Sequence, residues 1–151
     1  MKKLLSIAFL LIVPLFIVKA EETKSTMDLL TGHTWKLYEN YSTSYDAYYQ
    51  FTRDKIIIIT VIDDKKIINE YWYYLSDTNE GPFDNSKMGK SVNGKHIYFY
   101  DPEYNMSTTM EIIELSEEKL VYLNRRNVRE GVTPRPDIDY TIYYSTDDKI
   151  D

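Results

Sequence analysis

Hydrophobic and polar residues alternate along much of this chain with the two-residue period of a β-strand. Three segments alternate cleanly, at 34–41, 45–52 and 138–145, and each predicts a strand with one buried face and one wet face. On this parity we expect a set of aromatic side chains to point inward. They are Trp35, Tyr45, Tyr49, Phe51, Tyr140 and Tyr144.

Other segments are apolar on both faces, and their β-branched and aromatic residues favour strands. They comprise residues 55–62, 66–75, 95–101, 108–115 and 119–126. The segment 66–75 contains four consecutive aromatic residues, Tyr71, Trp72, Tyr73 and Tyr74. Because side chains alternate across a strand, either Tyr71 and Tyr73 or else Trp72 and Tyr74 face the interior. The pattern leaves both alternatives open.

Turn and helix signals organise these strands into one meander. The stretch "STMDLLTGHTW" predicts a single helical turn, capped by Ser25 or Thr26 and closed by Gly32 in the left-handed conformation. The dipeptide "NG" at 93–94 predicts a two-residue hairpin after a short strand near 88–92. We therefore expect an all-β, up-and-down antiparallel barrel of eight to nine strands, because closure removes exposed strand edges.

The chain begins with the pattern of an export signal. In "MKKLLSIAFLLIVPLFIVKAEE", two lysines precede an apolar stretch of 15 residues and a cleavage site at Ala20. A membrane-spanning helix needs about 20 apolar residues, so a removable signal is favoured over an anchor. We expect residues 1–20 to be removed as a signal peptide, leaving residues 21–151 as a single periplasmic or secreted domain.

Charge and cysteine usage narrow the class of protein further. Loss of the three lysines in residues 1–20 leaves 15 basic against 24 acidic side chains, a net charge of −9. This surplus disfavours binding to nucleic acid or to an anionic membrane surface. The chain contains no cysteine, so a hydrophobic core rather than disulfides must hold the exported domain together. Without a cysteine after the signal, we expect a soluble protein rather than a lipoprotein.

Three stretches resemble the lipocalin-like domains of small exported bacterial proteins. They are "LLTGHTWKLYE", "YYQFTRDKII" and "STTMEIIELSEEKLVYL". The family pattern maps onto Gly32 and Trp35 in the first stretch and onto Phe51 and Asp54 in the second. In the third stretch it maps onto Ile112, Leu115 and Leu120. The resemblance covers most of residues 27–145, and it implies a closed barrel that binds a small hydrophobic or amphipathic ligand.

A barrel of this family implies a ligand site at one mouth. We expect its walls to be aromatic, with Arg125 and Arg126 near the rim as a local positive patch. The alternatives are that the aromatic rings fill the interior as plain core, and that the arginines lie in a solvated loop. The expected wall residues are Trp35, Tyr49, Phe51, Tyr73 and Tyr140.

The outer face of 66–75 is a second candidate site. Exposed Trp72 and Tyr74 would suit contact with a protein, a glycan or a second copy of the chain. The alternative is that the chain's own helical turn and the loop at 76–87 cover this face.

No motif predicts catalysis or a metal site. The chain has no cysteine nucleophile, no Gly-x-Ser-x-Gly elbow, no phosphate-binding glycine loop and no paired-histidine motif. The stretch "DTNEGPFDN" resembles a calcium loop only superficially, because Pro82 and Met88 stand where that loop needs other residues. We therefore expect a non-enzymatic protein without a cofactor.

Overall fold

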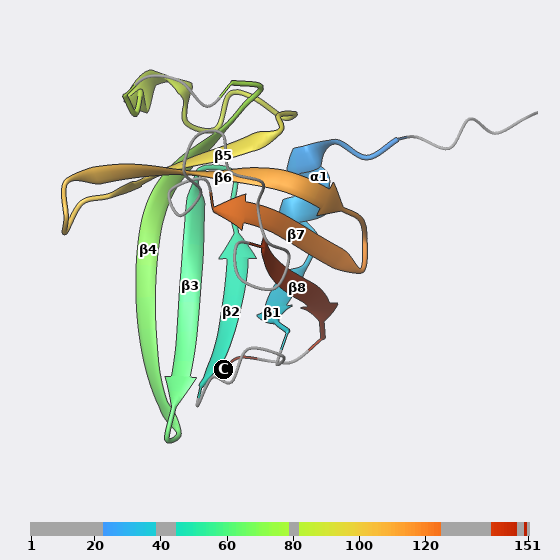
Figure 1. The fold of residues 1–151 in the computed structure, drawn as a ribbon, viewed down its shortest axis with the longest axis vertical. Coiled ribbons are helices and arrows are strands. Elements are labelled where there is room, and N and C mark those ends of the chain that lie inside the picture. Colours follow the sequence, from blue (N-terminus) through green and yellow to red (C-terminus); the bar gives the residue numbers. More distant parts are fainter. Residues whose placement is uncertain (1–22, 39–44, 79–81, 125–139, 148–149, 151) are drawn as a thin grey trace, which may run out of the picture.

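The chain forms a closed antiparallel β-barrel (Figure 1). The computed structural model describes residues 23–38, 45–78, 82–124, 140–147 and 150. In chain order the elements are α1 Thr26–Thr31, β1 Thr34–Leu37, β2 Asp46–Phe51, β3 Lys55–Ile62, β4 Lys65–Ser76, the 3₁₀ turn η1 Asn85–Lys87, β5 His96–Asp101, β6 Met106–Leu115, β7 Lys119–Asn124 and β8 Tyr140–Thr146. Each strand pairs with the next, and β8 closes the ring against β1.

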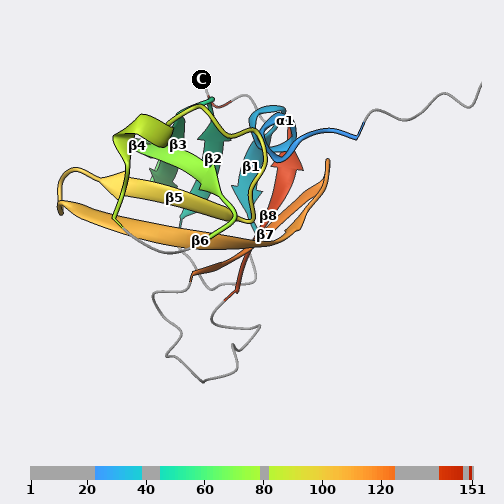
Figure 2. The same cartoon turned by 90° about the horizontal axis from the view of Figure 1, so that it is seen from above.

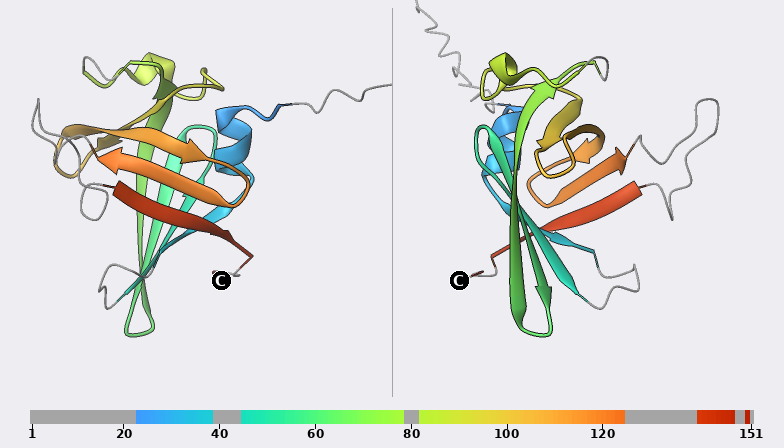
Figure 3. Two further views of the ribbon diagram at one scale, coloured as in Figure 1. Left: turned by 45° about the vertical axis from the view of Figure 1, so that its right-hand side comes forward. Right: turned by 90° about the vertical axis from the view of Figure 1, so that its left-hand side faces the viewer.

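The predicted all-β up-and-down barrel is therefore confirmed, with eight strands among the described residues. This architecture is compatible with a lipocalin-like fold. Figure 2 shows β5 and β6 on the opposite side of the molecule from β1 and β2. Figure 3 shows the long β3–β4 hairpin extending beyond the other strands, on the side away from α1.

The predicted short strand near 88–92 is wrong, and so is the hairpin at 93–94. This region is an irregular segment that follows η1, and its residues fasten other elements. The side chain of Asn93 accepts a hydrogen bond from the backbone N–H of Thr26 at 3.0 Å. Gly94 lies so close to β4 that a Cβ there would be 2.7 Å from the backbone nitrogen of Ser76.

The β3–β4 hairpin turns through two residues in the left-handed region. Asp63 and Asp64 have φ angles of 49° and 60°. Positive φ at both central residues is the geometry of the type I′ turn, whose twist matches that of the flanking strands. The turn fixes an unbroken register from Lys55 opposite Trp72 to Ile62 opposite Lys65.

The register decides which alternative holds for the aromatic run of β4. Tyr73 is fully buried in the core cluster, so Tyr71 also faces inward and Trp72 and Tyr74 face outward. Tyr71 is opposite Ile56, which belongs to the same core.

The orientation predicted for the last strand is wrong. Tyr143 is buried, opposite Leu37 of β1 and Leu120 of β7. Alternation from Tyr143 therefore places Tyr140 and Tyr144 on the outer face, where Tyr144 is 41% exposed. The apolar spacing of this strand misleads because Thr141 and Ser145 are the residues that flank Tyr143 on the inner face. The inward orientation predicted for Tyr45 is also not found, since that side chain precedes β2 and is exposed.

The short helix α1 closes one end of the barrel. Ser25 caps the helix in a capping box with Asp28. Of the two predicted caps, Ser25 and Thr26, the first is therefore confirmed. Gly32 follows with φ −73°, so the predicted left-handed closure is wrong. Glycine is needed for another reason, because a Cβ at this position would lie 2.9 Å from the carbonyl oxygen of Asp28.

Candidate functional site

The barrel has two ends of different character, which we name by their contents. At the helix end, α1 and the adjacent strand ends form a packed core of Met27, Leu30, Trp35, Phe51 and Tyr73. Further from α1 is the tyrosine end, where four tyrosines face the interior from β2, β4, β7 and β8: Tyr49, Tyr71, Tyr122 and Tyr143.

The polar groups of the aromatic side chains at the helix end form hydrogen bonds within the protein. The indole nitrogen of Trp35 donates to the carbonyl of Leu30 at 3.0 Å. The hydroxyl of Tyr73 donates to the carbonyl of Thr52 at 2.7 Å and lies 3.1 Å from the sulfur of Met27. Both rings are completely buried. These side chains therefore have no exposed surface, and their N–H and O–H donors are already used within the protein.

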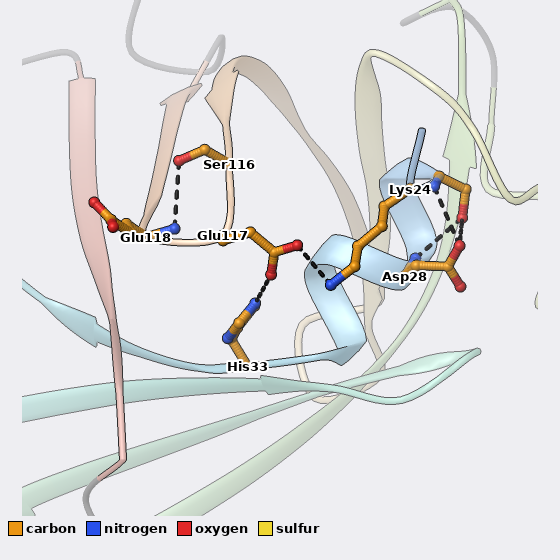
Figure 4. A network of polar contacts seen from close by, with 7 residues as sticks. Lys24, Asp28, His33, Ser116, Glu117 and Glu118 are labelled. Atoms are coloured by element: carbon orange, nitrogen blue, oxygen red, sulfur yellow. Dashed lines mark hydrogen bonds and ion pairs between the residues drawn. The ribbon is translucent and has the colours of Figure 1, made fainter. Parts of the chain in front are cut away.

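Polar contacts also fasten α1 over the helix end from two sides. The backbone N–H of Met27 donates to the carbonyl of Val92 at 2.9 Å. On the other side, Glu117 in the β6–β7 turn binds Lys24 at 2.5 Å and His33 at 2.7 Å (Figure 4). Lys24 and then His33 hold the pKa of the Glu117 carboxyl below its usual range. These contacts tie the helix to the barrel on opposite sides.

Three hydroxyls converge at the tyrosine end. The hydroxyl of Tyr122 lies 3.4 Å from that of Tyr49 and 3.4 Å from that of Tyr143. The rings of Tyr49 and Tyr143 pack with their centroids 4.6 Å apart, so the three side chains form one cluster. We call these three residues the tyrosine cluster. Their strands come from distant parts of the sequence, and only closure of the barrel brings them together.

The hydroxyls of the tyrosine cluster are only weakly bonded to one another. Hydrogen bonds between hydroxyl oxygens usually measure 2.7–2.8 Å. Each phenol offers one donor and two acceptor positions. Contacts of 3.4 Å use this capacity poorly, so the three hydroxyls retain hydrogen-bonding capacity for another oxygen.

Burial keeps Tyr49 and Tyr143 of the cluster neutral. Desolvation raises the pKa of Tyr49 and that of Tyr143 well above the ordinary value, and the phenol of Tyr122 adds to both shifts. Because the ordinary pKa of tyrosine is already about 10, these two hydroxyls keep their protons at physiological pH. They can therefore donate hydrogen bonds to an oxygen acceptor.

Partly buried apolar side chains lie opposite each member of the cluster on the paired strands. Ile58 is opposite Tyr49, Ile112 is opposite Tyr122 and Leu37 is opposite Tyr143, and all three pack against the core. Tyr71 packs edge-to-face on Phe99 with ring centroids 5.7 Å apart, and burial raises its pKa. The tyrosine end thus combines apolar surface with a few converging polar groups, which is the usual make-up of a small-molecule site.

The structure separates the predicted ligand residues into distinct groups. The inward orientation predicted for Trp35, Tyr49, Phe51 and Tyr73 is confirmed, but only Tyr49 belongs to the tyrosine end. Tyr140 lies on the outer face, so its prediction as a wall residue is wrong. Arg125 and Arg126 lie outside the described residues, as does the expected signal peptide.

Two members of the tyrosine cluster were not predicted. Tyr122 comes two residues after Leu120, an apolar position of the family pattern that is fully buried in the core, so alternation from Leu120 could have placed it inside. Tyr143 had no such signal, because the neighbouring apolar positions of its strand favour the opposite parity. Only the register with β1 and β7 identifies it.

The outer face of β4 differs from its prediction. Tyr74 is only 2% exposed, so its prediction as part of an exposed face is wrong. It stacks on Tyr98 with centroids 5.2 Å apart and contacts Phe83 at 5.1 Å, so the chain's own loop covers it. Trp72 does remain partly exposed, with the Lys55 ammonium 4.6 Å from its ring centroid.

A second aromatic surface lies where β1 meets β8. Tyr38 and Tyr144 are both partly exposed and pack edge-to-face with centroids 5.3 Å apart. They line an open groove of about 260 Å³ together with Lys36, Leu37, Ser145 and Thr146. This groove was not predicted, because the parity expected for the last strand placed Tyr144 inside.

Comparison with protein-family models, with curated proteins and with solved structures finds no match for this chain. Among the described residues, no group of three or more His, Cys, Asp or Glu side chains is placed to hold a metal ion. No helix in the described part of the chain is long and apolar enough to cross a membrane.

Proposed function

We propose that this chain is a non-enzymatic, exported, lipocalin-like protein that binds a small amphipathic molecule at the tyrosine end of its barrel. The observation that carries the proposal is the convergence of three weakly bonded phenol hydroxyls inside the barrel, of which those of Tyr49 and Tyr143 are kept neutral by burial. Leu37, Ile58 and Ile112 supply apolar surface beside them. The apolar part of the ligand packs on this surface, and an oxygen of its polar group accepts hydrogen bonds from the cluster.

A fluorescent fatty-acid probe tests this proposal. Titrated into the purified protein, the probe should bind saturably, and Tyr122→Phe and Tyr143→Phe should each weaken binding. Loss of one hydrogen bond costs about 0.5–1.5 kcal/mol, which corresponds to a roughly two- to tenfold higher Kd.

The matched control is Tyr144→Phe, which removes a hydroxyl from the neighbouring residue on the outer face. Its Kd should equal that of the unaltered protein. Absence of saturable binding, or equal effects of Tyr143→Phe and Tyr144→Phe, would contradict a site at the tyrosine end.

Export is part of the same proposal and is supported by the N-terminal pattern of two lysines, an apolar stretch and a small residue at Ala20. The mass of the protein recovered outside the cytoplasm should correspond to a chain that starts at Glu21. Recovery of the full-length chain from the cytoplasm would contradict it.

The aromatic groove on the outer surface supports a second candidate function, contact with a glycan or a protein. Exposed tyrosines offer large rigid surfaces with a polar tip, and Lys36 lies beside them. Tyr144→Ala would abolish glycan binding, measured on an array of soluble glycans, and leave the fatty-acid probe unaffected. The two functions are thereby distinguished with one variant.

A further inference from the structure

Strand β4 has two edges, and β5, which pairs with one of them, is shorter than β4. All of β3, from Lys55 to Ile62, pairs with β4 on one side. On the other side β5 pairs only with Trp72 to Ser76. In the described part of the chain, no strand pairs with this second edge of residues Lys65–Tyr71. This seven-residue segment, which we call the open edge, therefore directs alternate backbone N–H and C=O groups outward.

Of the features that usually block strand pairing, the open edge has charged side chains, at Lys65, Lys66 and Glu70, but no bulge and no proline. Its register against β3 is continuous. Two isoleucines on it are strongly exposed, Ile67 at 49% and Ile68 at 59%. An extended edge with exposed apolar side chains is a template for a further strand.

We propose that this open edge pairs antiparallel with the open edge of a second copy of the chain, about a two-fold axis at Ile68. A two-fold axis perpendicular to the sheet pairs residues that lie on the same face of their strands. Ile68 is the midpoint of Lys65–Tyr71, so this axis uses the whole edge and stops where β5 begins.

Charge complementarity selects the same axis. With Ile68 opposite Ile68 of the second copy, Lys66 faces Glu70 of the second copy, and symmetry makes this pair twice. The side chains of Lys66, Ile68 and Glu70 all lie on the outer face of β4. An axis at Ile67 would instead place Lys66 opposite an isoleucine and leave no opposite charges facing each other. Cross-strand pairs of opposite charge stabilise antiparallel strands, and like charges destabilise them.

The ion pair between Lys55 and Glu70 leaves Glu70 able to bind Lys66 of the second copy as well. One carboxylate oxygen of Glu70 accepts from Lys55 at 2.8 Å. The other oxygen can accept from Lys66 of the second copy, because a carboxylate accepts several hydrogen bonds. Lys66 itself is exposed and makes no ion pair with any described residue.

The contact is small, so the dimer should be weak. A standard stable interface uses roughly 20–30 residues on each side. The open edge supplies seven, so association should depend on concentration between about 10 µM and about 1 mM.

Sedimentation of the purified protein across this range tests the proposal, with two charge reversals as the decisive variants. Lys66→Glu alone and Glu70→Lys alone each place like charges opposite each other and should remain monomeric. An equimolar mixture of the two should form a heterodimer, because each reversed residue then faces its opposite charge. Lys90→Glu, which changes net charge equally at an exposed position away from the edge, should dimerise like the unaltered protein.

Thermal melting of each variant verifies that it is folded. A chain that stays monomeric up to about 1 mM would overturn the proposal. Dimers that persist in either single variant, or a mixture that does not associate, would overturn it as well.

Hydrogen exchange provides a second readout, which is independent of the variants. The amides of Lys65–Tyr71 that point away from β3 should exchange more slowly at high than at low protein concentration. Protection that instead appears only at other residues would place the interface elsewhere and overturn the proposal.

Discussion

The helix end and the tyrosine end of the barrel use the same kind of side chain in different ways. At the helix end, the hydroxyl of Tyr73 donates to a backbone carbonyl at 2.7 Å, and its ring is completely buried. At the tyrosine end, Tyr49, Tyr122 and Tyr143 contact one another's hydroxyls at 3.4 Å. A buried polar group is stabilising only when it is well bonded. The comparison therefore assigns stability to the first end, and it motivates the proposal of a ligand site at the second.

The largest expected effect separates the two tryptophans of the chain. Trp35→Ala removes a completely buried ring and leaves the Leu30 carbonyl without its donor, so the free energy of unfolding should fall by about 3–5 kcal/mol. Trp72→Ala removes a partly exposed ring over which Lys55 lies, and should cost about 1 kcal/mol or less. Denaturant titration measures both. Equal losses would show that the helix end is not the stabilising end.

The next effect concerns the covered outer face of β4. Tyr74→Ala removes a ring that stacks on Tyr98 and contacts Phe83, so it should lower the free energy of unfolding by about 3 kcal/mol. The comparison variant is Tyr144→Ala, whose ring is 41% exposed and should cost much less. Thermal unfolding distinguishes them. A melting temperature unchanged by Tyr74→Ala would mean that the loop carrying Phe83 does not pack on this face in solution.

Alkaline pH should act on both ends. Burial raises the folded-state pKa of Tyr49, Tyr73 and Tyr143. Below the ordinary tyrosine pKa of about 10, folded and unfolded chains hold the same phenol protons, so stability is complete. Above it the unfolded chain releases protons that the folded chain retains, and the free energy of unfolding falls as pH rises.

Phenolate absorbance during a pH titration measures this effect. A fraction of the 15 tyrosines should ionise only as the protein unfolds. Tyr49→Phe combined with Tyr143→Phe should flatten the alkaline decline in stability, while Tyr144→Phe should not. Simple titration of all tyrosines near pH 10 in the folded protein would contradict the burial of the cluster.

The smallest effect is at the cap of α1. Ser25→Ala removes the side-chain bonds of the capping box and should cost about 1 kcal/mol. Hydrogen bonds from Ser25 also lower the pKa of Asp28, so the contribution of the cap is present above the ordinary carboxyl pKa and lost as pH falls.

Stability measured against pH should therefore decline less steeply on the acid side in Ser25→Ala than in the unaltered protein. Thr26→Ala leaves the capping box intact and is the control. An acid limb that is identical in all three proteins would show that the cap does not contribute to holding α1 on the barrel.

Much of the barrel could be predicted from the alternation of apolar and polar residues. The segments 34–41, 45–52 and 55–62 alternate or carry isoleucine on both faces, and they form β1, β2 and β3. The first prediction runs beyond β1, which ends at Leu37, and its residues 39–41 lie outside the described residues. Periodicity works there because burial of a whole face dominates the choice of side chain. It fails for the last strand, where a single buried Tyr143 outweighs the apolar spacing of its neighbours.

The candidate site was predicted less completely than the fold. Tyr49 alone was identified, because it follows the clean alternation of the second strand. Tyr122 and Tyr143 lie beside Tyr49 only because β7 pairs with β8 and β8 pairs with β1. Such long-range register depends on ring closure, which no local pattern specifies. The coverage of Tyr74 likewise depends on a loop that returns Phe83 to β4.

The proposed division of the barrel into a packed end and a binding end can be tested most directly by the nuclear magnetic resonance signals of tyrosine rings labelled with ¹³C. Single Tyr→Phe variants assign the signals, and the fluorescent fatty-acid probe is then titrated into the protein. We predict saturable shifts for Tyr49, Tyr122 and Tyr143 and an unchanged signal for Tyr73. Shifts at Tyr73 without shifts in the tyrosine cluster would contradict the account.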